Sequence, residues 1–120
     1  MTGRTRIPAG PFLAAIAATG LLPGCSGGGG DLSESADRGR KNYQNVCIAC
    51  HNNDPNLDGS IGPANAGASL ALLEAKVIHG QYPPGYKPKR ETHAMPTFPY
   101  LNKDLPDLVA YLAEVQKPGS

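Results

Sequence analysis

The five residues Cys47-Ile48-Ala49-Cys50-His51 place two thiols and an imidazole within a short stretch of chain. This C-x-x-C-H pattern is the attachment sequence of haem c. Two thiols at this spacing can add to the two vinyl groups of one porphyrin. The histidine that follows is then held under the iron, where its imidazole becomes the proximal ligand. The spacing therefore predicts one covalently bound haem, attached through Cys47 and Cys50 and ligated by His51.

Two other chemistries use closely spaced cysteines. A zinc site would need further Cys or His ligands, and the only histidines outside the motif are His79 and His93. A thioredoxin-type dithiol should follow a strand in a βαβ pattern, which this sequence lacks. A chance occurrence of the pattern is the third alternative.

Met95 is the candidate for a second axial ligand of the iron. The chain contains two methionines, and the other is Met1. Met95 lies among prolines in a polar segment, where packing does not explain a methionine. His93, two residues away, and the more remote His79 are the alternative ligands. A thioether stabilises ferrous iron relative to a second imidazole, so a His51/Met95 pair predicts a comparatively high reduction potential.

The first 24 residues have the pattern of a secretory signal. Arg4 and Arg6 give a positively charged start, and residues 12–22 form an apolar core too short to span a bilayer. The sequence Leu22-Pro23-Gly24-Cys25 resembles the lipobox of bacterial lipoproteins, although its proline departs from that pattern. We therefore expect residues 1–24 to be a lipoprotein-type signal and Cys25 to be lipidated. Ordinary cleavage that leaves Cys25 as a free thiol, or an uncleaved anchor, is the alternative.

Residues 25–32, which contain a run of four glycines, are expected to form a flexible tether between the lipid and the domain. Lipidation predicts an extracytoplasmic protein on the periplasmic side of a membrane, and Ser26 after the cysteine favours the outer membrane. The whole chain has a formal charge of +1. Loss of Arg4 and Arg6 leaves −1, which does not indicate a nucleic-acid partner.

Three segments have helical signals, and no segment has a clear strand pattern. Residues 33–46 begin with serines that can cap a helix and with acidic residues in its first turn. Residues 69–79 carry apolar positions on one face and end at Gly80. Residues 104–116 begin with Asp104 as a candidate cap and carry an apolar stripe. The apolar stripe consists of Leu105, Leu108, Leu112 and Val115.

The sequence from about residue 33 to residue 116 resembles the class I cytochromes c of mitochondria and bacteria. Gly39 and Tyr43 lie eight and four residues before Cys47, where that family has a glycine and an aromatic residue in its N-terminal helix. The other matching positions are Leu108 and Tyr111 in the C-terminal helix, Gly62-Pro63 after the haem motif, and Met95-Pro96 followed by Phe98 in the methionine loop.

This resemblance implies an all-α class I fold over residues 33–117, with the N- and C-terminal helices crossing and loops wrapped around one haem. It implies that Gly39 lies where the two helices cross and that the Pro63 carbonyl accepts a hydrogen bond from the His51 Nδ1–H group. It also favours Met95 as the axial ligand. The loop between Gly80 and Met95 is longer than in compact bacterial members of the family.

The predicted function is one-electron transfer at the extracytoplasmic face of a membrane, by a monomer that is not an enzyme. Its partners would be redox proteins, a donor and an acceptor, together with the membrane that holds the lipid. A dedicated haem subunit of a larger dehydrogenase or reductase is the alternative, and a peroxidase-like enzyme or gas sensor is a third. We also expect Lys87, Lys89 and Arg90 to flank the haem edge and to steer an acidic partner.

Overall fold

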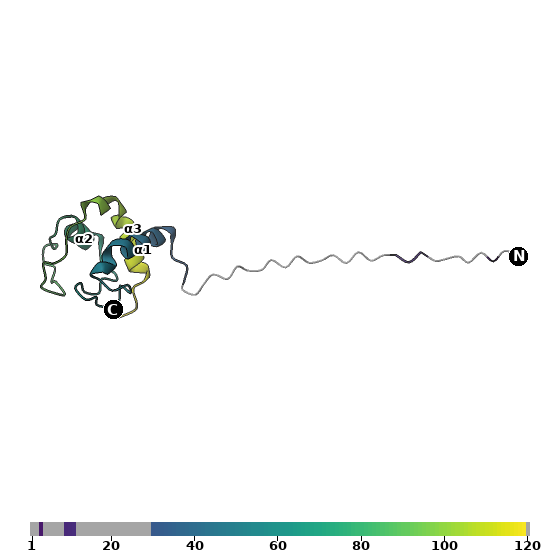
Figure 1. Ribbon diagram of the computed structural model, residues 1–120, viewed down its shortest axis with the longest axis horizontal. Helices are drawn as coiled ribbons and strands as arrows, with labels where there is room; N and C mark the ends of the chain where they lie inside the picture. The colour runs from purple at the N-terminus through teal and green to yellow at the C-terminus, as the bar shows by residue number, and fades with distance from the viewer. Residues whose placement is uncertain (1–2, 4–8, 12–29, 120) are drawn as a thin grey trace.

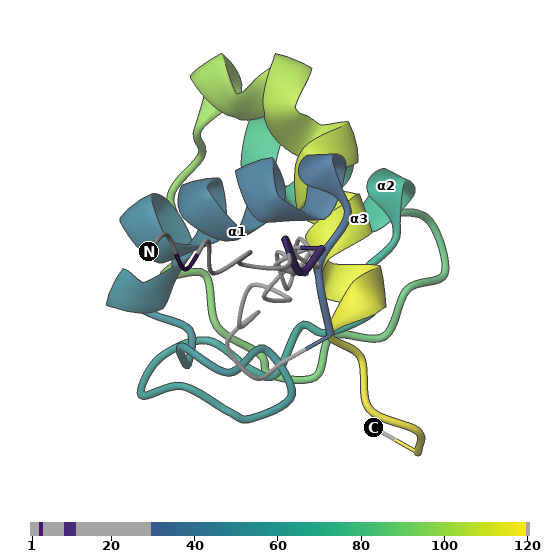
Figure 2. The same ribbon diagram turned by 90° about the vertical axis from the view of Figure 1, so that its right-hand side faces the viewer.

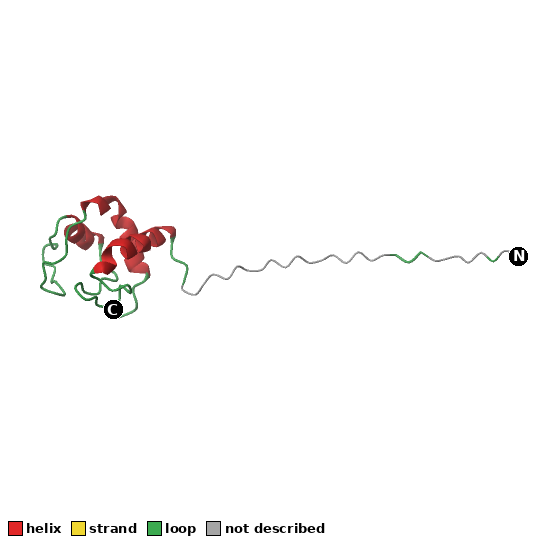
Figure 3. Ribbon diagram, viewed as in Figure 1, coloured by secondary structure: helices red, strands yellow, loops and turns green. Residues whose placement is uncertain are grey.

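The structure, a computed structural model, describes residue 3, residues 9–11 and residues 30–119 of the 120-residue chain. Cys25 and most of the expected signal and tether lie outside the described residues. The described part is helical and contains no strand, as expected for an all-α fold (Figures 1 and 3). Its elements are α1 (Glu34–Val46), η1 (Cys47–Ala49), α2 (Leu70–Leu73), η2 (Glu74–Ile78), η3 (Pro99–Asp104) and α3 (Leu105–Glu114).

Helices α1 and α3 cross in direct contact, and this crossing is the centre of the fold (Figure 2). Gly39 is buried at the crossing point. A Cβ atom at this position would overlap the carbonyl oxygen of Asp107 and would lie 2.9 Å from the Cβ of Tyr111. The crossing expected from the resemblance is therefore confirmed, and its closeness depends on the missing side chain of Gly39.

Side chains from both helices fill the core on either side of this crossing. Tyr43 of α1 packs against Tyr111 of α3, with ring centroids 5.5 Å apart. Leu108 and Leu112 of α3 are almost completely buried, as the apolar stripe predicts. The other buried core residues are Ala36, Leu73, Val77, Leu101 and Leu105.

Ser33 fastens the start of α1 to the end of α3. Its Oγ accepts a hydrogen bond from the Ala36 amide at 3.1 Å, which is the expected helix cap. The same hydroxyl donates to Glu114 at 2.6 Å, and the Ser33 amide donates to the other Glu114 oxygen at 3.0 Å. These bonds hold the pKa of Glu114 below its ordinary value, so the carboxylate stays ionised at neutral pH.

The other two helices differ in detail from the sequence prediction. The predicted helix over residues 69–79 is capped by Ser69 and ends at Gly80, but its second half, η2, is a π-helical turn. Asp104 occupies the position before α3, yet its side chain makes no capping hydrogen bond, so the predicted cap is wrong. The 3-10 turn η3 runs directly into α3, which leaves Asp104 in helical backbone geometry rather than in the extended geometry of a cap.

Asp107 links the two crossing helices through a charged pair. Its carboxylate accepts hydrogen bonds from Arg38 at 2.8 and 2.9 Å and from the Ser35 hydroxyl. The bond from Arg38 is the main cause of a lowered Asp107 pKa, and the bond from Ser35 is the second. A lowered folded-state pKa means that the pair stabilises the fold above the ordinary carboxylate pKa of about 4. This stabilisation is lost as the pH falls through the folded-state pKa.

We therefore expect Asp107→Asn to lower the free energy of unfolding at pH 7 and to make the acid side of the stability profile shallower. Denaturant unfolding measured from pH 7 to pH 3 tests this expectation. Asp31→Asn, which removes an exposed carboxylate before α1, is the control. Parallel pH profiles of the wild-type protein and Asp107→Asn would contradict the assignment.

Candidate functional site

The turn η1 positions the two thiols and the imidazole at the end of α1. The Cys50 and His51 amides both donate to the Cys47 carbonyl, at 3.2 and 2.9 Å. This hydrogen bonding folds the five-residue motif into one compact turn. Cys50 and His51 line a cavity of about 420 Å³, and Cys47 joins them in the wall of an adjoining cavity of about 130 Å³.

The His51 ring is held by the segment Gly62-Pro63. Its Nδ1 lies 2.8 Å from the Pro63 carbonyl oxygen, which is the contact expected from the resemblance. A carbonyl can only accept, so Nδ1 must carry a proton, and in the neutral ring Nε2 is then the nitrogen with a free lone pair. A Cβ at Gly62 would collide with the His51 ring, so the glycine lets the backbone approach the imidazole. The amide of Gly62 fixes this approach by donating to the Cys50 carbonyl at 2.9 Å.

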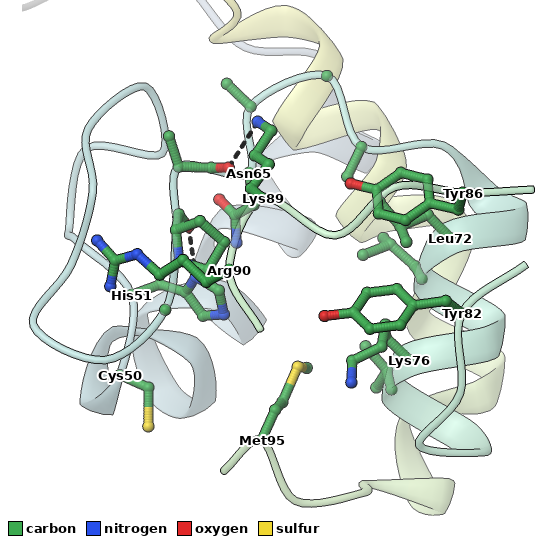
Figure 4. A pocket seen from close by; sticks show the side chains of 18 of the residues that line it. Cys50, His51, Asn65, Leu72, Lys76, Tyr82, Tyr86, Lys89, Arg90 and Met95 are labelled. Carbon is green, nitrogen blue, oxygen red and sulfur yellow. Dashed lines mark hydrogen bonds between the residues drawn. The ribbon is translucent and has the colours of Figure 1, made fainter. Parts of the chain in front are cut away.

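Met95 lies in the wall of both cavities that His51 lines. Figure 4 shows its thioether sulfur directed into the cavity that the His51 ring also enters. The chain after Met95 is fixed by the Phe98 amide, which donates to the Val77 carbonyl at 2.6 Å. The methionine loop is therefore attached to η2, and its sulfur atom and the His51 imidazole share one space.

His79 and His93 are exposed and line neither cavity. Among the described residues, no three His, Cys, Asp or Glu side chains gather as a metal-binding group. Burial, with a smaller contribution from Cys50, raises the pKa of Cys47 to about 11, so this group is a neutral thiol near pH 7. A reactive dithiol would need a readily formed thiolate, and a zinc site would need further His or Cys ligands beside the two thiols, so neither alternative gains support from the described residues.

The lining of the two cavities suits a large apolar group that carries negative charge. The smaller cavity is enclosed by core side chains, which are Tyr43, Leu73, Val77, Leu101, Leu108 and Leu112. The larger cavity has a volume within the range of about 300–1,000 Å³ usual for ligand sites. Its lining includes Lys76, Lys89 and Arg90 but no Asp or Glu. A porphyrin, which has an apolar ring and two carboxylate side chains, fits this lining.

Comparison with known proteins agrees with this site. Residues 36–116, most of the described part of the chain, match the cytochrome c family. The chain belongs to the cytochrome c family. Over 85 residues it is 35% identical to a cytochrome c-553-like protein of Synechocystis sp., and this alignment covers 68% of the chain and 70% of that relative. No solved structure matches the chain significantly. The cofactor of this cytochrome c is covalently attached haem c.

The sequence analysis did not anticipate a second wall of the larger cavity. Tyr82 and Tyr86 stack with their ring centroids 5.4 Å apart, and the Nζ atom of Lys76 lies 4.3 Å above the Tyr82 ring. Figure 4 shows Tyr82 and Lys76 across the cavity from His51. The two tyrosines come from a proline-rich loop without periodicity, so no local signal in the sequence indicates that they stack.

Lys87, Lys89 and Arg90, which form a basic cluster in the same loop, differ in whether they line a cavity. Lys87 and Lys89 are both exposed and Arg90 is half-buried, but only Lys89 and Arg90 line the larger cavity, and Lys87 lines neither cavity. Lys89 donates to the Ala64 carbonyl at 2.9 Å, and Arg90 donates to the Ile61 carbonyl at 2.9 Å. The expectation that all three cations steer a partner stays a prediction, and the geometry fits Lys87 best.

Proposed function

We propose that this cytochrome c is a one-electron carrier whose haem is attached through Cys47 and Cys50 and ligated by His51 and Met95. The observation that carries the proposal is the cavity that the unprotonated Nε2 side of His51 and the sulfur of Met95 share, next to both thiols. The bound haem supplies an iron that alternates between the ferric and ferrous states.

The residues around the cavity support this role in distinct ways. Pro63 accepts the Nδ1 proton, which fixes the ring orientation of His51 and raises the basicity of its other nitrogen. Leu73 and Val77 are nearly buried and give both cavities an apolar wall, which would limit the access of water to a bound haem. Protein side chains at both axial positions would leave no open coordination site for a substrate, which favours electron transfer over catalysis.

The optical spectrum of the purified protein tests the proposal. We expect the spectrum of a six-coordinate low-spin haem c in both redox states. The protein should exchange electrons with a soluble redox protein, and its ferrous form should not bind carbon monoxide at neutral pH. Rapid carbon monoxide binding to the wild-type ferrous protein would instead indicate an open site and a sensor or enzyme.

We further propose that lipid on Cys25 holds the domain at an extracytoplasmic membrane surface. The support is the lipobox-like sequence that ends at Cys25 and the glycine-rich segment behind it. In the described residues, no helix is long and apolar enough to cross a membrane.

Replacing Cys25 by serine should release the haem-containing protein from membranes and leave its optical spectrum unchanged, because the domain begins after residue 32. Fractionation of cells that express each form is the measurement. Equal solubility of the wild-type protein and Cys25→Ser would rule out the lipid anchor.

A further inference from the structure

The larger cavity has an unbalanced charge. Three of the residues that line it are cations, namely Lys76, Lys89 and Arg90, and none is an acid. Positive side chains beside a largely apolar cavity are costly unless negative charge faces them. We therefore expect an occupant of the cavity to carry an anionic group on the side where these cations lie.

Two of the cations are held in place by hydrogen bonds to uncharged groups. Lys89 Nζ donates to the Ala64 carbonyl at 2.9 Å, and one Arg90 nitrogen donates to the carbonyls of Gly59 and Ile61 at 3.3 and 2.9 Å. These carbonyls flank Gly62-Pro63, the segment that holds His51. The bonds position both cations beside the proximal ligand, but carbonyl groups do not neutralise their charge.

Both side chains keep unused hydrogen-bonding capacity. An ammonium group has three donors and a guanidinium group has five, more than the described contacts use. Asp58 lies 3.3 Å from Arg90, but this acid is 64% exposed and does not line the cavity. No carboxylate among the described residues pairs with Lys89. Lys89 and Arg90 can therefore each offer further donors to a carboxylate of the cavity's occupant.

We propose that Lys89 and Arg90 bind the carboxylate side chains of the haem, so that the long loop over residues 81–92 acts as a clamp on the cofactor. The inference rests on the proposed haem attachment and assigns new partners within that site. It gives two members of the basic cluster a role in cofactor binding in place of partner docking. The third member, Lys87, lines neither cavity and provides a matched control.

The test compares Lys89→Gln, Arg90→Gln and Lys87→Gln in the holoprotein. Resonance Raman spectra report the bending modes of the haem carboxylate side chains, which respond to hydrogen bonds at these groups. We expect these modes to shift in Lys89→Gln and Arg90→Gln and to stay at the wild-type position in Lys87→Gln. The reduction potential should fall in the first two variants, because loss of a nearby positive charge favours the ferric state.

Arg90→Lys keeps the positive charge but loses the planar set of guanidinium donors. Its reduction potential should therefore be close to that of the wild type, and its Raman modes should lie between those of the wild type and of Arg90→Gln. Wild-type Raman modes in both Lys89→Gln and Arg90→Gln would overturn the proposal, even if thermal unfolding shows that the loop contacts stabilise the fold. An equal change in Lys87→Gln would also overturn it, because the effect would then be general surface charge. Each of these results leaves the His51/Met95 assignment intact, since that depends on a different optical signature.

Discussion

Replacing Gly39 by valine should destabilise the protein strongly. The new Cβ would overlap the carbonyl oxygen of Asp107, and this oxygen belongs to helix backbone that cannot rotate away. The helices must separate or shift, which opens the contact between Tyr43 and Tyr111. Overpacking of a core typically costs about 1–3 kcal/mol, and a collision with backbone belongs at or above the upper end of that range.

Gln44→Val is the matched control, because this residue lies in the same helix but is exposed. Gln44→Val introduces the same β-branched side chain. It should lower the free energy of unfolding only by the difference in helix propensity, at most about 0.7 kcal/mol. Guanidinium unfolding followed by circular dichroism gives both free energies in the holoprotein. Equal losses in the two variants would show that the helices do not meet at Gly39.

The local chemistry of the site could be predicted from sequence because it is encoded in adjacent residues. Cys47, Cys50 and His51 lie within five positions, so a single turn brings them together in any fold that forms the turn. The helix over residues 33–46 was predicted with its cap because the serines at its start and the acidic residues in its first turn are both local signals. The partners of Gly39 and His51 lie 68 and 12 positions away, and only the family resemblance indicated them.

The parts that were missed depend on contacts between loops that lack periodicity. Nothing in the sequence indicates that Lys89 and Arg90 donate hydrogen bonds to carbonyls 25 and 29 residues earlier. Every residue has a backbone carbonyl, so residue type does not show which one is the acceptor. The cap assigned to Asp104 was wrong for a related reason. An aspartate can cap a helix only where the helix begins at that residue. Here η3 continues into α3, so the helical backbone begins before Asp104.

Met95→Ala is the substitution with the largest expected effect on the haem, because we propose Met95 rather than His93 as the second axial ligand. Met95 lines both cavities together with His51, whereas His93, two residues earlier, is exposed and lines neither. The oxidised wild-type protein should show the long-wavelength iron–sulfur charge-transfer band of His/Met ligation. Met95→Ala should abolish this band and open the iron to carbon monoxide or imidazole, and His93→Ala should do neither.

Met95→Ala should also lower the reduction potential, because the thioether that favours ferrous iron is lost. The fall should be on the order of 100 mV or more, a fraction of the roughly 0.8 V over which axial ligands set haem potentials. Added methionine-like thioethers should restore the band in part, because the cavity that held the side chain remains. The opposite pattern, with no band in the wild type and an iron opened only by His93→Ala, would move the axial position to His93. The carrier would then operate at a much lower potential, and its donor would have to be a correspondingly stronger reductant.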